Sequence, residues 1–167
     1  MKRHLFLTGE KHIGKSTVIA KLLEDSQLTV GGFRTVRTDT VFAGRRSVHM
    51  LRPGESPTKE NLLFICGEKS ADMASRFDTL GCTILEESAD AQLLLMDELG
   101  PKEAEALAFQ RAVLSALDGD TPILGVLQQA DSPFLRQIAE HEAVEVVEVT
   151  KENRDTLPAL LRKQFHF

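Results

Sequence analysis

The sequence predicts an α/β fold, in which a mostly parallel sheet carries helices on both faces and has a small antiparallel hairpin beside it. Short apolar runs alternate with longer amphipathic segments, which is the pattern of parallel strands joined by crossover helices. The length of 167 residues suits one domain over residues 1–167. Hydrophobic residues make up 42% and charged residues 27%, as in an ordinary folded domain, so a real core is expected.

The first half of the chain predicts a strand, a helix and then a hairpin. Residues 4–8 form an apolar run that stops at a glycine, and the helix-forming residues 15–25 follow. A second strand is expected at residues 32–37. Phe42 and residues 48–51 flank the turn residues 43–46, which predicts a hairpin between residues 40 and 51. Two prolines and a glycine make residues 52–59 the most loop-like stretch.

The second half alternates regularly between helix and strand patterns. Apolar residues at helical spacing predict helices at residues 70–79, 84–89, 103–118, 133–141 and 154–164. The apolar runs between them predict strands at residues 93–97, 123–127 and 144–149.

Charge and composition exclude several classes of function. Lys plus Arg is 20 and Asp plus Glu is 25, so the net charge of −5 has the wrong sign for a protein that coats nucleic acid. The chain has neither Trp nor Tyr to stack on bases. No segment has the length and apolarity of a membrane span. Cys66 and Cys82 form no metal-binding pair, which fits a reducing cytoplasmic location.

The turn after the first strand carries the strongest motif. Residues 9–16 are GEKHIGKS, which fills every fixed position of the phosphate-binding sequence GxxxxGK[ST] between a strand and a helix. Backbone N–H groups in such a loop converge on phosphate oxygens, Lys reaches the outer phosphates and the hydroxyl binds Mg²⁺. We therefore expect phosphate binding by Gly9, Glu10, Lys11, His12, Ile13, Gly14, Lys15, Ser16 and Thr17, with Lys15 also catalytic and Ser16 on the metal.

A second acidic signal follows the strand at residues 93–97. Leu93 to Met96 lead into Asp97 and Glu98, where a protein with a phosphate loop places its second metal-side group. We expect Asp97 to hold Mg²⁺ and Glu98 to polarise the attacking water. The alternative is a strand that simply leaves the core at two acidic residues.

Residues 97–100 also spell DxxG, the switch turn of small GTP-binding proteins. Those proteins recognise guanine through NKxD after a later strand, and the corresponding residues 128–131 are QQAD here. Because the Asn and Lys are missing, a guanine-specific switch is the weaker interpretation.

Several other polar residues are candidates for the site. Arg34 and Arg37 could clamp a phosphate, or lie on a solvated hairpin face. Asn153 and Arg154 could border the base or neutralise phosphate charge, or Asn153 could be the N-cap of the last helix. Gln128 could orient water near the γ-phosphate, or merely leave the sheet.

Together, these motifs resemble those of a known family. It comprises the small nucleoside-triphosphatases with a phosphate loop from bacteria and archaea, and it includes the cancer-related nucleoside-triphosphatase. Besides the loop, GGFRT at residues 31–35 resembles the family's GGFxT, and VTKENRD at 149–155 its VTxENRD. DELG at 97–100, with Glu103 and Phe109, resembles its DEIGxME…F block, which makes Glu103 a further site candidate. The chain differs at His12 and Lys102, where the family usually has Gly and Met, and in the hairpin at residues 47–50.

This resemblance implies a three-layer, RecA-like P-loop NTPase fold with an extra strand between the first strand and the Asp97 strand. It also implies slow, Mg²⁺-dependent hydrolysis of several NTPs. We therefore expect hydrolysis of ATP, GTP and other NTPs to NDP and phosphate, with a nucleoside triphosphate as the partner and no nucleic acid or membrane. A nucleotide or small-molecule kinase and a nucleotide-dependent binding switch remain alternatives.

Overall fold

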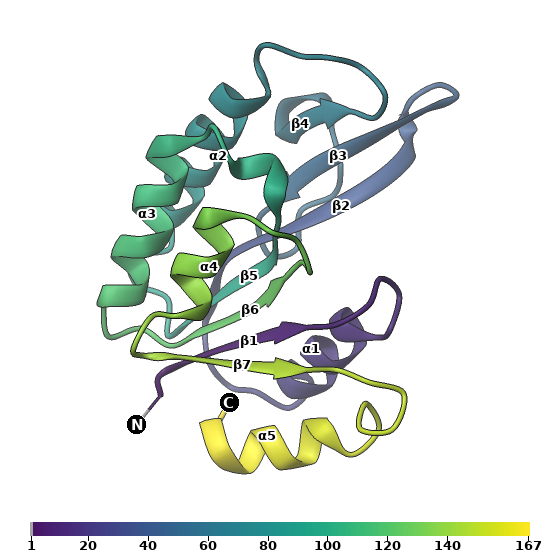
Figure 1. Ribbon diagram of the computed structural model, residues 1–167. Helices are drawn as coiled ribbons and strands as arrows, with labels where there is room; N and C mark the ends of the chain where they lie inside the picture. Colours follow the sequence, from purple (N-terminus) through teal and green to yellow (C-terminus); the bar gives the residue numbers. More distant parts are fainter. Residues whose placement is uncertain (1) are drawn as a thin grey trace.

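The computed structural model describes residues 2–167, and the strands of this range form one sheet (Figure 1). Its order is β4-β3-β2-β5-β6-β1-β7. The strands are β1 (His4–Thr8), β2 (Val30–Phe42), β3 (Arg45–Leu51), β4 (Leu62–Ile65), β5 (Leu93–Leu99), β6 (Ile123–Leu127) and β7 (Val144–Glu148). The run from β2 to β7 is parallel, whereas β3 pairs antiparallel with both β2 and β4. Strand β6 lies between β1 and β5, as the family resemblance implied.

Helices cover both faces of the sheet and separate two hydrophobic cores. The helices are α1 (Lys15–Leu23), α2 (Met73–Glu87), α3 (Leu107–Asp118), α4 (Pro133–Ala139) and α5 (Leu157–Phe165). Figure 1 shows α2, α3 and α4 on one face and α1 and α5 on the other. Phe6, Phe33, Phe77 and Phe109 belong to the first core, whereas Leu5, Leu7 and Leu22 belong to the second. Alternate residues of β1 thus enter opposite cores, as the period of two in a strand requires. The predicted three-layer α/β fold is confirmed.

The five predicted strands are all present, and the predicted bounds of β1 and β6 are exact. Strand β2 runs from Val30 to Phe42 rather than over residues 32–37, because it continues into the predicted hairpin with β3. Strand β5 continues through Glu98 to Leu99, and β7 ends at Glu148 instead of residue 149. Strand β4 was missed, although Leu62 to Ile65 is a continuous apolar run of the kind that predicts a buried strand.

The two helices predicted at residues 70–79 and 84–89 are one continuous helix, α2. Gly81 lies within it, and a Cβ atom there would come 2.1 Å from the ring of Phe109 on α3. Glycine lowers helix propensity, but here it allows α2 and α3 to approach closely around Phe109. The close packing of two helices therefore overrides a local signal for a break.

The remaining helices differ from prediction mainly at their ends. The segment predicted as a helix from residue 103 begins instead with a short 3₁₀ turn, η2 (Pro101–Glu103), and α3 starts at Leu107. The Phe109 N–H, which has no partner inside the helix, donates to Asp78 Oδ1 on α2 at 2.8 Å. Helices α1 and α4 end two residues before the predicted residues 25 and 141, and α5 begins three residues after the predicted residue 154.

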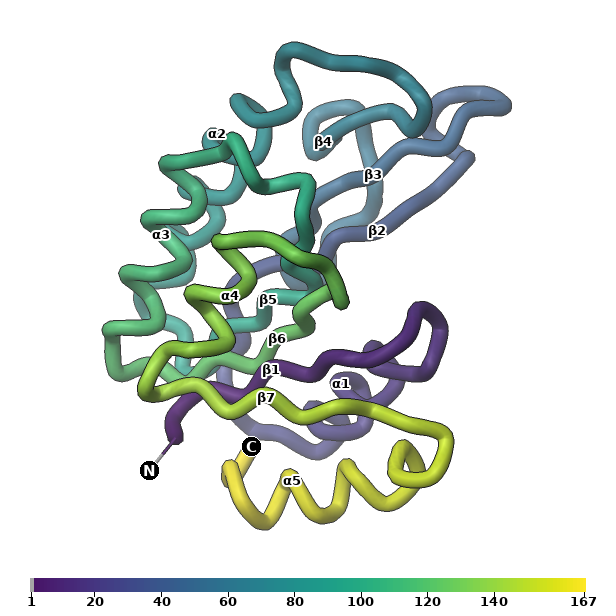
Figure 2. Tube along the Cα trace, viewed as in Figure 1, coloured from purple at the N-terminus to yellow at the C-terminus, as the bar shows by residue number. Residues whose placement is uncertain are grey.

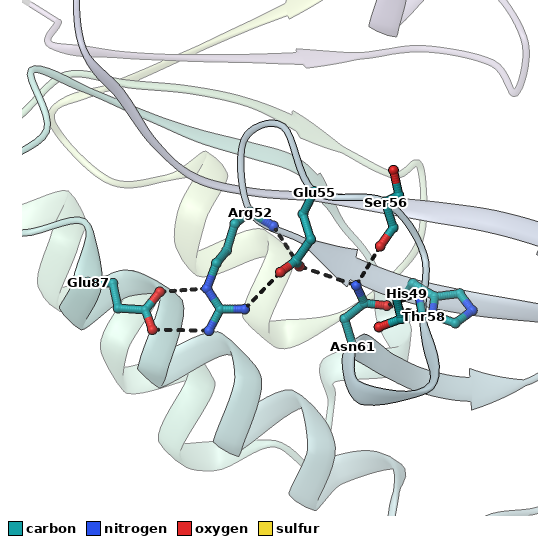
Figure 3. A network of polar contacts seen from close by, with 7 residues as sticks. All are labelled: His49, Arg52, Glu55, Ser56, Thr58, Asn61 and Glu87. Atoms are coloured by element: carbon teal, nitrogen blue, oxygen red, sulfur yellow. Dashed lines mark hydrogen bonds and ion pairs between the residues drawn. The ribbon is translucent and has the colours of Figure 1, made fainter. Parts of the chain in front are cut away.

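A polar network that runs from buried to exposed residues fixes the loop between β3 and β4 (Figure 3). His49 Nδ1 donates to Asn61 Oδ1 at 2.8 Å, and Asn61 Nδ2 donates to Glu55 Oε1 at 3.2 Å. Arg52 joins Glu55 to Glu87 of α2, with its Nε 2.6 Å from Glu87 Oε2. His49 and Asn61 are buried, so their polar atoms need these partners. The network holds β4 and the loop against α2.

No helix in residues 2–167 is both long enough and apolar enough to span a bilayer.

Candidate functional site

The loop between β1 and α1 is shaped by glycines at positive φ. Gly9 has φ +141° and Gly14 has φ +116°, which other residues rarely adopt. A Cβ atom on Gly9 would also lie 2.7 Å from the carbonyl oxygen of Val149. Lys15 Nζ donates to the carbonyl oxygens of Gly9 at 2.6 Å and of Glu10 at 3.0 Å. The loop therefore curls around one ammonium group at the start of a helix, where backbone N–H groups are free to bind an anion.

The loop after β7 supports this first loop from the side. Both lie at the carboxyl end of the parallel strands, as the tube in Figure 2 shows. Arg154 Nη1 donates to the carbonyl oxygen of Ile13 at 3.2 Å. Arg154 therefore contacts the phosphate loop directly.

Asn153 holds its own loop together and is not the N-cap of α5. Its Oδ1 accepts the Thr150 N–H at 2.8 Å, and its Nδ2 donates to the Glu148 carbonyl at 2.8 Å. The residue that precedes α5 is Thr156. The cap interpretation was wrong because residues 150–156 form turns before the helix begins.

Ser16 and Asp97 meet across the site, although 81 positions separate them in the sequence. Ser16 Oγ donates to Asp97 Oδ2 at 3.3 Å. Burial and the neighbouring charge of Glu98 raise the pKa of Asp97, and the Ser16 hydrogen bond, Arg34 and Lys15 oppose this rise. The Asp97 carboxylate and the Ser16 hydroxyl are hard oxygen ligands, and a cation between them would stabilise the buried negative charge.

Glu98 points into a different space from its neighbour Asp97. Asp97 and Ser16 line a cavity of about 220 Å³, whereas Glu98 lines one of about 290 Å³ with Gly9 and Lys15. Gln128 Nε2 donates to Glu98 Oε1 at 2.6 Å, which fixes the carboxylate. We call the 290 Å³ cavity the phosphate cavity.

Of the two candidate arginines on β2, each reaches a different cavity. Arg34 lies beside Asp97 in the sheet register and lines the 220 Å³ cavity, whereas Arg37 lines the phosphate cavity. Arg45 of the same hairpin lies at its far end, paired with Glu68. The two arginines therefore belong to different cavities, and Arg37 is the one that shares a cavity with Glu98.

Glu103 lies below the site rather than in contact with the phosphate loop. Its side chain is 4% exposed, and its Oε2 accepts the Gly100 N–H at 2.8 Å. Gly100 in turn lies under Gln128, since a Cβ on Gly100 would come 2.6 Å from the Gln128 carboxamide. Glu103 therefore supports the residue that orients Glu98. Burial raises the pKa of Glu103 to about 7, an effect that the Gly100 N–H opposes and the charge of Glu98 reinforces.

We expect Glu103→Gln to remove a pH dependence of stability. With its pKa raised from 4.5 to about 7, Glu103 keeps its proton in the folded state over a range where the unfolded chain loses it. Folding of the wild type is therefore weakened as pH rises through this range, by about 2 to 3 kcal/mol between pH 5 and 8. Glutamine can still accept the Gly100 N–H and carries no charge.

Urea unfolding of both proteins at several pH values measures this effect. The unfolding free energy of Glu103→Gln minus that of the wild type should rise by about 2 to 3 kcal/mol from pH 5 to pH 8. Glu105→Gln, at an exposed position two residues away, should give a flat difference. A flat difference for Glu103→Gln as well would contradict the assignment.

Thr35 is a residue of the site that sequence reasoning missed. The Glu98 N–H donates to Thr35 Oγ1 of β2 at 3.3 Å. Thr35 belongs to the GGFRT block, whose register beside β5 would have indicated this contact. Among the predicted loop residues, Gly9 and Ile13 are buried, whereas Glu10, Lys11, His12 and Thr17 are exposed.

In the described part of the chain, no three His, Cys, Asp or Glu side chains gather as a ready-made metal site. A cation at Ser16 and Asp97 would need further oxygen ligands from water and from a bound phosphate. This arrangement is typical of Mg²⁺, which keeps several waters and combines one or two carboxylates with substrate phosphates.

Known proteins resemble the chain over nearly its whole length. A sequence model of the family described as NTPase matches residues 4–161. The nucleoside-triphosphatase THEP1 of Thermofilum pendens is 32% identical over 177 residues, which covers 97% of this chain and 94% of that protein. The cancer-related nucleoside-triphosphatase of Homo sapiens is 30% identical over 179 residues, which covers 94% and 93%.

Two solved structures are also similar. The crystal structure of THEP1 from Aquifex aeolicus gives a TM-score of 0.77 at 19% identity and covers 98% of this chain and 99% of that one. The solution structure of a human cancer-related nucleoside triphosphatase gives 0.67 at 26% identity and covers 97% and 96%. Both structures show that the similarity to this chain extends from the sequence to the fold.

Proposed function

The chain belongs to the NTPase family, and we propose that it hydrolyses nucleoside triphosphates, ATP and GTP included, to the diphosphate and phosphate. The observation that carries this proposal is the convergence of Lys15 and the Gln128-bound Glu98 on one cavity, the phosphate cavity. The Ser16–Asp97 pair lines the separate 220 Å³ cavity.

The phosphate loop would bind the triphosphate through its N–H groups and through Lys15. The Lys15 ammonium already lies against the carbonyl oxygens of Gly9 and Glu10, so it is placed at the centre of the loop. On binding it would donate to the outer phosphate oxygens, which gain negative charge during transfer. Arg37, which also lines the phosphate cavity, would add a further positive charge.

Ser16 and Asp97 would hold Mg²⁺. Their oxygen atoms are 3.3 Å apart, and Asp97 is desolvated enough that burial raises its pKa. When bound, Mg²⁺ would neutralise charge on the phosphates. Arg34 lies on the same side and would limit the net negative charge there.

Glu98 would activate the attacking water. Gln128 binds one carboxylate oxygen and leaves the other available for a water in the phosphate cavity. The water oxygen would bond to the γ-phosphorus as the bond to the β,γ-bridging oxygen breaks, and the water proton would pass to Glu98.

The free thiols Cys66 and Cys82 fit a cytoplasmic location, which we also infer.

Phosphate release from ATP, GTP, CTP and UTP, with and without Mg²⁺, tests the proposal. We expect turnover of several of the four NTPs, loss of activity with EDTA and recovery when Mg²⁺ is restored. Ser16→Ala should raise the Mg²⁺ concentration needed for half-maximal activity, whereas Ser26→Ala, outside the site, should leave it unchanged. Turnover that persists in EDTA would contradict the metal assignment, and no turnover of any NTP would contradict hydrolysis.

A further inference from the structure

A larger cavity opens beside the phosphate cavity and is not used by the proposed hydrolysis. It has a volume of about 420 Å³, within the range of small-molecule binding sites. Strands β2, β3 and β4, helix α2 and the η2 turn supply most of its wall. We call it the side cavity.

The side cavity adjoins the phosphate cavity. Four residues line both of them: Lys11, Arg37, Glu98 and Gln128. A ligand in the side cavity therefore reaches the carboxylate that would otherwise activate water. The oriented Glu98 thus faces both a γ-phosphate position and a second binding space.

The walls of the side cavity combine an apolar surface with positive charge. Val36, Val48 and Phe64 supply apolar surface, and the Lys102 ammonium lies 5.7 Å from the centre of the Phe64 ring. Lys11 and Arg37 also face the phosphate cavity, so Lys102 is the lysine that remains for a second ligand.

The other charged groups of the wall are two carboxylates, Glu98 and Glu103, against the three cations Lys11, Arg37 and Lys102. Glu103, with its pKa near 7, is partly neutral at physiological pH, which leaves Glu98 as the main carboxylate. A planar apolar group beside Phe64 with an anionic group at Lys102 would satisfy both kinds of surface.

We propose that the side cavity binds a phosphoryl acceptor, a small organic anion with an apolar ring-sized part and a hydroxyl group that faces Glu98. This proposal rests on the proposed function, because it uses the same phosphate loop and the same carboxylate. Hydrolysis is then the reaction that takes place when water occupies the position of the hydroxyl.

The transfer follows the same course as hydrolysis, with an alcohol in place of water. The hydroxyl oxygen bonds to the γ-phosphorus, and the bond from that phosphorus to the β,γ-bridging oxygen breaks. The nucleoside diphosphate leaves with the electron pair of the broken bond. The hydroxyl proton passes to Glu98 and then to solvent, so the products are a phosphate ester, NDP and a proton.

A probe of this chemical class tests the transfer. The protein is incubated with Mg²⁺, ATP and 4-(hydroxymethyl)benzoate, and phosphate ester and inorganic phosphate are measured by ³¹P NMR. We expect ester to form, at least tenfold more than from benzyl alcohol, which lacks the anionic group. Lys102→Ala should lower the ratio of ester to phosphate about tenfold, whereas Arg46→Ala, at an exposed hairpin position outside both cavities, should not change it.

Alkylation of the two cysteines locates the ligand independently of turnover. Cys66 lines the side cavity, whereas Cys82 lies on α2 outside it. In protein saturated with ADP, the probe should slow the reaction of Cys66 with iodoacetamide and leave that of Cys82 unchanged.

These measurements separate the two proposals. Phosphate release without ester or protection of Cys66 would overturn the acceptor site and leave hydrolysis standing. Protection of Cys66 with phosphate release but no ester would overturn the transfer step. Protection of Cys66 without any turnover would support the site and contradict the proposed hydrolysis.

Discussion

Replacement of Glu98 by glutamine is expected to slow phosphate release by about 10²- to 10⁴-fold, the range contributed by a positioned general base. Glutamine has nearly the same shape as glutamate but does not accept the proton of the attacking water. The variant should still bind nucleotide, because the phosphate loop and the Ser16–Asp97 pair are unchanged. Steady-state phosphate release and equilibrium binding of a fluorescent ATP analogue measure the two effects separately.

Glu105→Gln is the matched control for this variant. Glu105 is exposed and lines neither the phosphate cavity nor the side cavity, so both turnover and binding should match the wild type. Normal turnover in Glu98→Gln would contradict the assignment of Glu98 as the general base. Loss of binding in the same variant would instead indicate that Glu98 helps to form the nucleotide site.

Lys15→Ala is expected to weaken nucleotide binding about 100-fold, which corresponds to about 2.7 kcal/mol. The ammonium donates to both the Gly9 and the Glu10 carbonyl oxygens, and its removal takes away charge-assisted hydrogen bonds to the outer phosphates. Turnover should fall further, because those bonds strengthen as charge develops on the transferred group. Titration with the same ATP analogue gives the affinity.

Lys21→Ala provides the control on the same helix, since Lys21 is exposed in the last turn of α1. It should bind nucleotide like the wild type. Triphosphate binding with unchanged affinity in Lys15→Ala would mean that the loop amides alone hold the nucleotide. Equal losses for ADP and ATP would place Lys15 on the inner rather than the outer phosphates.

The phosphate loop could be predicted from the sequence because its chemistry is local. Gly9, Gly14, Lys15 and Ser16 lie within eight residues, and backbone conformation dictates each glycine. The acidic pair at residues 97 and 98 was also visible, because a strand ends nearby and adjacent side chains in a strand point to opposite sides.

Contacts between distant segments could not be predicted in the same way. The Gln128–Glu98 hydrogen bond joins the ends of two neighbouring strands, and either residue alone is compatible with a simple exit from the sheet. The continuity of α2 depends on Phe109, which lies 28 positions beyond Gly81. The side cavity was missed with β4, because its wall exists only when that strand joins the sheet.

The edge strand β4 can open separately from the inner strands of the sheet, because the polar network at residues 49–61 is what ties its loop down. Strands β5 and β6 lie inside the sheet between two cores, so their amides should exchange with solvent only when the whole protein unfolds. Strand β4 is a four-residue edge strand, and the His49–Asn61 and Arg52–Glu87 contacts tie its loop to the rest. A local fluctuation that breaks those contacts would open the wall of the side cavity while the phosphate loop stays intact. Local opening at this edge of the sheet would thus admit or release an acceptor while the nucleotide stays bound.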